Sequence, residues 1–295
     1  MTTAVATATG GLYRFARRSP LNLAGSVFAL VIVTIGIVGL VSAALDLIWT
    51  PYDPLKISLH ERLEPPSLSH PFGTDKTGRD VFSRVLSGAY ISLSLTVAVL
   101  TMATIIGTAV GLVAGYFGGW VDEVLMRVTD VFLAFPALIL AAAISATFGG
   151  TLLTTTAALG AVFWPWYARL VRSRVLSVKT EDFVTAYRCL GASHGRVMGR
   201  CILPIVLPLV IVQATTDAGL VMLSAAGLSF LGLGAQPPTP EWGAMIFNAM
   251  SHQPDHWWLA AFPGLGLAMT ALAFTLVGDG LRDLLDPDSQ AAIED

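Results

Sequence analysis

The feature that most limits what this chain can fold into is its division into apolar stretches of about twenty residues. A hydrocarbon core about 30 Å thick requires roughly 20 apolar residues per helix. Charged residues make up only 13% of the 295 residues, whereas soluble domains usually carry about 25%. We therefore predict an all-α integral membrane protein with about six transmembrane helices. The six stretches are approximately 23–45, 89–116, 131–148, 152–171, 202–223 and 259–277.

The positions of Lys and Arg predict the orientation, because cytoplasmic loops carry the excess of these residues. With the N-terminus inside, most of the Lys and Arg fall on the inner side, and the outer loop 224–258 holds none. We therefore predict both termini in the cytoplasm. The predicted parts are a cytoplasmic tail 1–22, a first span 23–45, an extracytoplasmic segment 46–88, a membrane core 89–280 with a cytoplasmic loop 172–203, and a cytoplasmic tail 281–295.

Basic residues precede the first span, namely Arg14, Arg17 and Arg18. This arrangement is also found in signal peptides. The apolar run 23–45 is longer than the apolar region of a cleaved signal peptide, and no clear cleavage site follows it. We expect an uncleaved anchor.

The end of the extracytoplasmic segment, 80–89, is predicted to begin an amphipathic helix that lies along the outer surface and leads into the second span. Asp80 is placed four residues before Arg84, a spacing that suits an ion pair on a helix. The apolar residues of this stretch share one face. They are Val81, Phe82, Val85, Leu86 and Ala89.

The second span carries a small residue at every fourth position. This spacing lines the residues up on one helix face, where another helix can approach closely. Two interpretations stay open, an interface with a partner permease and packing within this chain's own bundle. The residues are Ala103, Gly107, Gly111 and Gly115.

Asp217 is the one carboxylate deep inside a predicted span. An Asp at a helix centre costs roughly 2.5–3.5 kcal/mol on insertion scales, so it should face a cavity or a partner. One hypothesis is that Asp217 and its neighbour Gln213 line a translocation pathway and attract a cationic group, such as a peptide amino terminus. The alternative is a structural hydrogen bond to Gln213 or to another helix.

We identify no catalytic, cofactor or metal site in the sequence. His252 and His256 have a spacing that metal ligands use on helices, but Pro254 between them argues against a regular helix. Cys189 and Cys201 both fall in the predicted cytoplasmic loop, where reduced thiols are the norm.

The loop around 180–204 is predicted to form two short helices. Thr180 is placed to cap the first, with Glu181 and Asp182 in its first turn, where the helix dipole favours negative charge. Gly191 follows where a glycine ends a helix, and Ser193 can begin a second helix that runs to Leu203, before Pro204. The residues of the first helix that share an apolar face are Phe183, Ala186, Tyr187 and Leu190.

Three interpretations of this apolar face are open. It can occupy a groove on a partner protein, lie on anionic lipid, or pack on its own bundle.

The residues 181–204, EDFVTAYRCLGASHGRVMGRCILP, resemble the signature loop of ATP-binding-cassette (ABC) importer permeases. Ala186, Gly191 and the pair Leu203–Pro204 match that signature. Thr185 and Tyr187 depart from it, because they stand where the family has Glu and Ala.

Further stretches resemble the second permease subunit of dipeptide, oligopeptide and nickel importers. They are FGTDKTGRDVFSRVLSGAYISLSL (72–95), LSFLGLGAQPPTPEWG (228–243) and FPGLGLAMTALAFTLVGDGLRDLLDP (262–287). The resemblance covers nearly the whole chain.

The resemblance implies a permease of the type I importer fold in the cell membrane, in contact with lipid. It implies a second homologous permease, two ABC ATPase subunits and an extracytoplasmic substrate-binding protein as partners, and no nucleic acid. ATP would be bound by the ATPases. The residues that would couple this chain to them are Glu181, Asp182, Phe183, Thr185, Ala186, Tyr187, Leu190, Gly191, Leu203 and Pro204.

The sequence contains no phosphate-binding G-x-x-x-x-G-K-[ST] motif, since no lysine of the chain follows a glycine. Energy must then come from a partner or an ion gradient. A secondary transporter usually carries several ionisable groups in its spans, whereas here one deep Asp is found. We expect the importer to take up di- or oligopeptides, with nickel or another small solute as the alternative.

Overall fold

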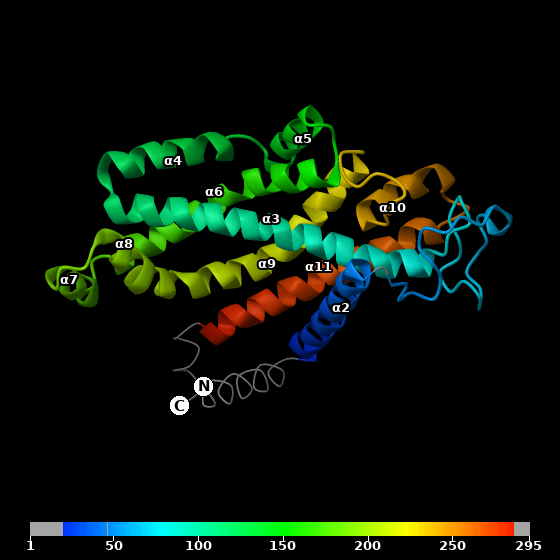
Figure 1. The fold of residues 1–295 in the computed structure, drawn as a ribbon, viewed down its shortest axis with the longest axis horizontal. Helices are drawn as coiled ribbons and strands as arrows, with labels where there is room; N and C mark the ends of the chain where they lie inside the picture. Colours follow the sequence, from blue (N-terminus) through cyan, green and yellow to red (C-terminus); the bar gives the residue numbers. More distant parts are fainter. Residues whose placement is uncertain (1–19, 46, 286–295) are drawn as a thin grey trace.

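The computed structural model describes residues 20–45 and 47–285, and within them the fold is helical (Figure 1). The predicted tails, including Arg14, Arg17 and Arg18, lie largely outside the described residues. The helices are α2 (Pro20–Ala44), η1 (Leu59–Glu61), α3 (Val81–Phe117), α4 (Gly119–Leu133), α5 (Ala137–Thr147), α6 (Leu152–Val178), α7 (Asp182–Cys189), α8 (His194–Arg196), η2 (Val197–Ile202), α9 (Leu203–Phe230), α10 (Trp242–Ala249), η3 (Met250–His252) and α11 (Trp258–Leu285).

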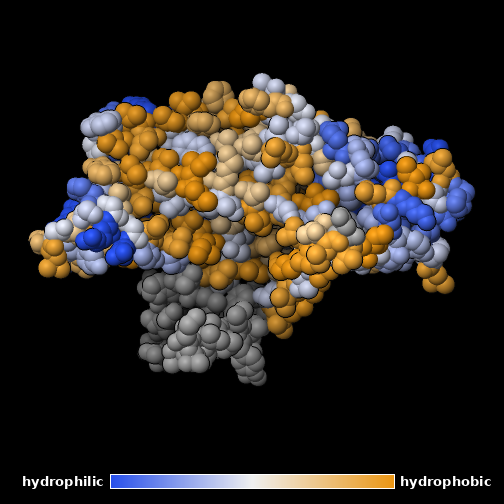
Figure 2. Space-filling model, viewed as in Figure 1, coloured by the Kyte–Doolittle hydropathy of each residue, from blue (hydrophilic) through white to orange (hydrophobic). Residues whose placement is uncertain are grey.

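The long helices form an elongated bundle with polar loops at its two ends. Helix α7 lies at one end, and the segment 47–80 lies at the opposite end near α10 (Figure 1). Hydrophobic residues cover much of the length of the bundle, and hydrophilic residues gather toward the ends (Figure 2). This distribution is the one expected for a bundle surrounded by lipid.

The predicted number of about six spans is imprecise. In the described residues, four helices are long and apolar enough to cross a membrane, and five if a bent pair is counted as one span. Helix α6 has 27 residues and is long enough to cross a membrane. The threonines at 154–156 and its basic second half make it less apolar than the four helices counted here.

The continuous helix predicted over 131–148 is wrong. Helix α4 ends at Leu133, α5 begins at Ala137, and the two are bent by 86°. Pro136 lies at the break; it lacks a backbone N–H, and its ring disfavours helical conformation in the preceding residue. The predicted third span is therefore part of a sharply bent helix pair and not a single straight helix.

The helix start predicted at 80–89 leads directly into the second span, since α3 runs unbroken for 37 residues from Val81. At 1.5 Å per residue it is about 56 Å long, so it extends well beyond a hydrocarbon core. The predicted apolar face is nevertheless largely buried, with Val81 at 1% and Ala89 at 2% exposure.

The ion pair predicted between Asp80 and Arg84 does not form. Asp80 instead caps α3, where its Oδ2 accepts a hydrogen bond from the Ser83 backbone N–H at 2.7 Å, and its Oδ1 lies 2.9 Å from His70 Nδ1. Capping satisfies a free N–H of the first turn. Arg84 faces Asp75 instead.

The stripe of small residues on α3 lies against α6 of the same chain. A Cβ atom added at Gly111 would be 2.8 Å from Val171 Cβ, and one added at Gly115 would be 2.8 Å from Val175 Cβ. Gly107 meets the backbone of α6 in the same way, and Ala103 is fully buried. The two backbones therefore approach as closely as packing allows, and this pair forms the centre of the main hydrophobic cluster.

Candidate functional site

The first helix of the predicted cytoplasmic loop presents an uncovered face. Helix α7 buries only Val184, at 0% exposure, while the side chains of the predicted apolar face are open among the described residues. Phe183 is 43% exposed, Tyr187 40% and Leu190 85%. Lone exposed apolar residues are common, but three on one short helix form a patch typical of an interface.

The start of α7 differs from the prediction. Glu181, in extended conformation, is the N-cap residue, and the Thr180 hydroxyl donates a hydrogen bond to the Ser177 carbonyl at 2.9 Å. Thr180 is therefore bound to the end of α6 and is not free to cap α7. Glu181, Asp182, Thr185 and Ala186 are exposed beside the apolar patch.

The end of α7 is set by Gly191. Its φ is +80°, a conformation that favours glycine, and its backbone N–H donates to the Arg188 carbonyl at 2.9 Å. The second helix predicted from Ser193 does not stop before Pro204. It continues through a π-helical turn, η2, into α9, because Pro204 lies in the first turn of α9, where a missing N–H is tolerated. Leu203 and Pro204 thus lie at the base of α9.

Contacts that the sequence analysis missed hold α7 to the bundle. Val184 belongs to the same buried cluster as Val197 and Ile202. The Tyr116 hydroxyl at the end of α3 shares a 2.9 Å hydrogen bond with His194 Nδ1, and the Arg188 guanidinium lies 4.9 Å from the centre of the Tyr116 ring. Tyr116 is 78 residues from His194, so no local pattern could have paired them.

A lysine also joins the loop to α3. The Lys179 ammonium donates a hydrogen bond to the Gly115 carbonyl at 2.7 Å. Lys179 directly follows α6, so this bond joins the end of α6 to the end of α3 just before α7 begins. Helix α7 itself contacts α3 through Arg188 and Tyr116.

Asp217 is enclosed by two donors. The Tyr167 hydroxyl donates to its Oδ2 at 2.9 Å, and the Gln213 amide donates to its Oδ1 at 2.9 Å. The hydrogen bond to Gln213 is the one that the sequence predicted as an alternative to a pathway role for Asp217. The hydrogen bond from Tyr167, on α6, was not predicted. Asp217 and Gln213 remain partly exposed, and each carboxylate oxygen can accept a further hydrogen bond.

Two ion pairs fasten α4 to α6. Arg172 binds Asp122 through two hydrogen bonds of 2.5 and 2.6 Å, and Arg169 binds Asp130 at 2.6 Å. From the sequence, these arginines indicate only the orientation of the chain, and their ion-pair partners could not be predicted. Their partners lie 50 and 39 residues away, beyond the reach of helical spacing rules.

No cluster of three or more potential metal ligands occurs in the part of the chain that the structure describes. The centroids of the His252 and His256 rings lie 6.1 Å apart, edge to face, with His252 at the end of η3 and His256 in the turn that follows. Cys189 and Cys201 are free thiols.

Known proteins match the chain over most of its length. The family model "Binding-protein-dependent transport system inner membrane component" matches residues 107–290. The chain is 44% identical to the probable D,D-dipeptide transport system permease protein DdpC of Escherichia coli K12 over 236 residues, 80% of this chain and 79% of DdpC. It is also 44% identical to the nickel transport system permease protein NikC of Escherichia coli K12 over 239 residues, 81% of this chain and 86% of NikC.

A solved structure shows the same fold. A chain of the MetNI methionine ABC transporter, in an inward-facing conformation, matches with a TM-score of 0.55 and 19% identity, covering 70% of this chain and 98% of that chain. The predicted all-α membrane fold of a type I importer permease is confirmed. This protein is a multi-pass inner-membrane protein that belongs to the family of binding-protein-dependent transport system inner membrane components.

Proposed function

We propose that this chain is a permease subunit of an ATP-driven importer that takes up di- or oligopeptides delivered by an extracytoplasmic binding protein. The observation that carries the proposal is the uncovered face of α7, which displays Phe183, Tyr187 and Leu190 within the sequence that resembles the permease signature loop. An exposed amphipathic helix fits a groove on a partner protein.

In this proposal, α7 occupies a groove on an ABC ATPase subunit. ATP is bound and hydrolysed there, and this chain supplies neither catalytic residues nor a cofactor. When the ATPases close, they displace α7, and the displacement passes to α3 through the contact of Arg188 with Tyr116 and to α6 through the short connection at Lys179. The permease is then a two-state bundle whose equilibrium is shifted by a ligand bound at a distance.

The proposed assembly contains a second homologous permease and two ATPase subunits, with the binding protein on the outer side. Each permease would form half of the pathway. Asp217 and Gln213 are proposed to line this chain's half, since both are partly exposed in the middle of α9. The carboxylate would attract the amino terminus of a peptide.

A nickel importer is the second candidate. It is supported by the identity to NikC, which equals the identity to DdpC at 44%. Overall identity therefore does not decide between the two substrates.

The test is uptake into proteoliposomes that contain the complex purified with its natural partners. We expect ATP-dependent and binding-protein-dependent uptake of a radiolabelled dipeptide, and no competition from excess nickel. Uptake of radioactive nickel that excess dipeptide leaves unchanged would reject the peptide assignment. Uptake driven by an ion gradient without ATP would reject the importer itself.

A further inference from the structure

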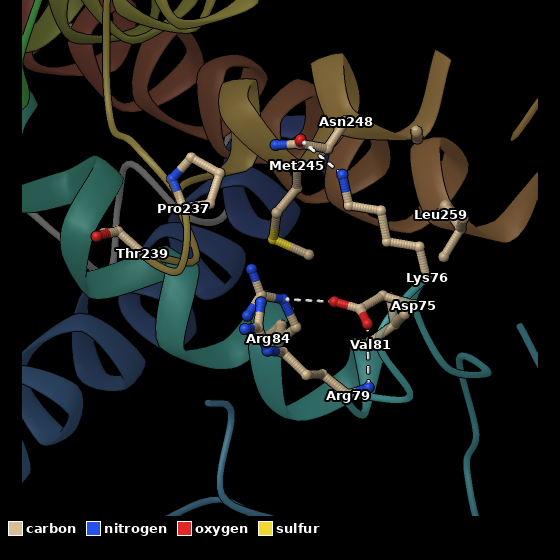
Figure 3. Close-up of a pocket in the computed structure, with 11 residues that line it drawn as sticks. Asp75, Lys76, Arg79, Val81, Arg84, Pro237, Thr239, Met245, Asn248 and Leu259 are labelled. Atoms are coloured by element: carbon tan, nitrogen blue, oxygen red, sulfur yellow. Dashed lines mark hydrogen bonds and ion pairs between the residues drawn. The ribbon is translucent and has the colours of Figure 1, made fainter. Parts of the chain in front are cut away.

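A small charged pocket lies at the end of the bundle opposite α7. Its walls come from the segment before α3, the start of α3, the loop between α9 and α10, and α10 itself (Figure 3). Its cavity volume is about 60 Å³. Neither the coupling face nor Asp217 belongs to it.

Arg84 forms the floor of this pocket and is only 7% exposed. Its Nη1 donates to the backbone carbonyls of Pro54 at 2.9 Å and Pro238 at 3.3 Å. Its Nε lies 3.6 Å from Asp75 Oδ2. Among the described residues these are the interactions of its guanidinium, so no hydrogen bond is formed by Nη2 and the pairing of Nε with Asp75 is a long one.

Asp75 does not balance the positive charge of the pocket. Its Oδ1 already accepts three hydrogen bonds, from the Thr77 backbone at 2.7 Å, the Thr77 hydroxyl at 2.6 Å and the Arg79 backbone at 3.0 Å. This carboxylate therefore shapes the turn before α3, and it leaves one oxygen for Arg84.

Two further cations line the pocket without a carboxylate partner in the described residues. The Nε of Arg79 is buried and has no hydrogen-bond partner there. The Lys76 ammonium reaches only the amide oxygen of Asn248, at 3.4 Å. Figure 3 shows the Asp75–Arg84 pair below and the Lys76–Asn248 pair above, with the Met245 thioether directed between them.

The pocket thus holds three cationic side chains, Lys76, Arg79 and Arg84, and one carboxylate, Asp75, whose Oδ1 already accepts three hydrogen bonds. A partly buried cation without a counter-charge is unfavourable, and an anion that enters would relieve this. Guanidinium donors match a carboxylate in a planar, two-bond geometry. The apolar wall of Val81, Met245 and Leu259 fits an alkyl group attached to that anion better than a fully hydrated ion.

We propose that this pocket binds a carboxylate carried on a small apolar group, and that this binding is used on the outer face during transport. The carboxylate can come from the free end of a peptide substrate or from an Asp or Glu side chain of the binding protein. Binding itself does not depend on the proposed function, whereas its use in transport does.

Binding is tested on the purified full-length chain in detergent, with N-acetyl-leucine as the probe and its neutral amide as the control. We expect the acid to raise the thermal unfolding temperature and the amide to leave it unchanged, since a ligand of the folded state stabilises it. Arg79→Gln should weaken the apparent affinity for the acid roughly tenfold or more.

Arg62→Gln is the matched control, because Arg62 is an exposed arginine of the same segment that does not line the pocket. It should keep the affinity of the unmodified chain. If Arg79→Gln does not fold, the test uses Lys76→Gln, at the exposed rim of the pocket. Its affinity for N-acetyl-leucine should be about threefold lower than that of the unmodified chain. Equal stabilisation by acid and amide, or unchanged affinity in the variant that folds, would overturn the proposal.

The source of the carboxylate is tested with Arg79→Gln in the complete transport complex. If the substrate supplies it, KM rises for a free dipeptide and not for its C-terminal amide. If the binding protein supplies it, the affinity of that protein for the complex falls with either cargo, and more so at low salt. If Arg79→Gln no longer binds N-acetyl-leucine, and neither the KM for the dipeptide nor the affinity of the binding protein for the complex changes, the pocket has no use in transport. The proposed role in transport then fails.

Discussion

At the scale of single residues, Asp217 accepts structural hydrogen bonds, and we propose that it also binds substrate. Tyr167 and Gln213 each donate one hydrogen bond to it, which offsets part of the free energy of placing a carboxylate in a span. Its partial exposure leaves room for a third donor. A cationic amino terminus is the donor expected of a peptide.

Asp217→Asn should raise KM for dipeptides with a free amino terminus several-fold, because a charge-assisted hydrogen bond becomes a neutral one. The measurement is ATP-driven uptake in proteoliposomes. An N-acetylated dipeptide is the matched substrate control, and its uptake should not change. Equal KM values for the free peptide in both proteins would assign Asp217 a purely structural role.

Side-chain contacts between residues far apart in the sequence could not be predicted. Gln213 and Asp217 are four apart, so their contact could be anticipated from helical spacing. Tyr167 is 50 residues from Asp217, and Arg172 is 50 residues from Asp122. Such pairs depend on how helices pack against one another, which a single sequence does not encode in any local pattern.

At the scale of elements, the close contact of α3 and α6 depends on residues without side chains. Gly111→Ala should lower the free energy of unfolding by about 1–3 kcal/mol, because the added methyl group would meet Val171 at 2.8 Å and the backbone of α6. Thermal unfolding in detergent measures this.

Gly227→Ala is the control, since a Cβ there meets nothing within 4 Å. It should be neutral or stabilising by up to about 1 kcal/mol through helix propensity. Equal effects of the two substitutions would mean that α3 and α6 are not in close contact.

The exposed face of α7 has its own prediction. Phe183→Ala and Tyr187→Ala should each lower substrate-stimulated ATP hydrolysis by the complex about tenfold or more, since central interface aromatics often contribute about 2 kcal/mol or more to binding. As the control, Phe148→Ala removes an aromatic residue that is more exposed, at 71%, and lies away from α7, and it should have no effect. Unchanged stimulation in the α7 variants would exclude α7 from coupling.

Local sequence patterns were sufficient to predict that α7 forms and that it ends at Gly191, because both depend on neighbouring residues. They were insufficient for the ends of other helices. Pro136 breaks the third span, whereas Pro204 lies inside a continuous helix. The difference arises because Pro204 falls in a first turn whose N–H groups need no partner within the helix, and that register is fixed by the π-helical turn before it.

At the scale of the whole molecule, the two polar regions lie at opposite ends of the bundle. This separation agrees with a cytoplasmic coupling loop and an extracytoplasmic segment, as the distribution of Lys and Arg predicts. The count of spans could not be predicted reliably, because α6 is polar for a membrane helix and α4 and α5 form a sharply bent pair.

The central claim, that α7 docks on an ABC ATPase, is tested most directly with the chain's own thiols. Cys189 is exposed at the end of α7, and Cys201 is half-buried near the start of α9. In the purified complex, a short cross-linker whose maleimide alkylates the Cys189 thiol and whose active ester acylates a lysine amine should join this chain to an ATPase subunit. The product should disappear in Cys189→Ser and persist in Cys201→Ser. An undiminished cross-link in Cys189→Ser, or a Cys189 that joins only lipid or another permease, would contradict the account.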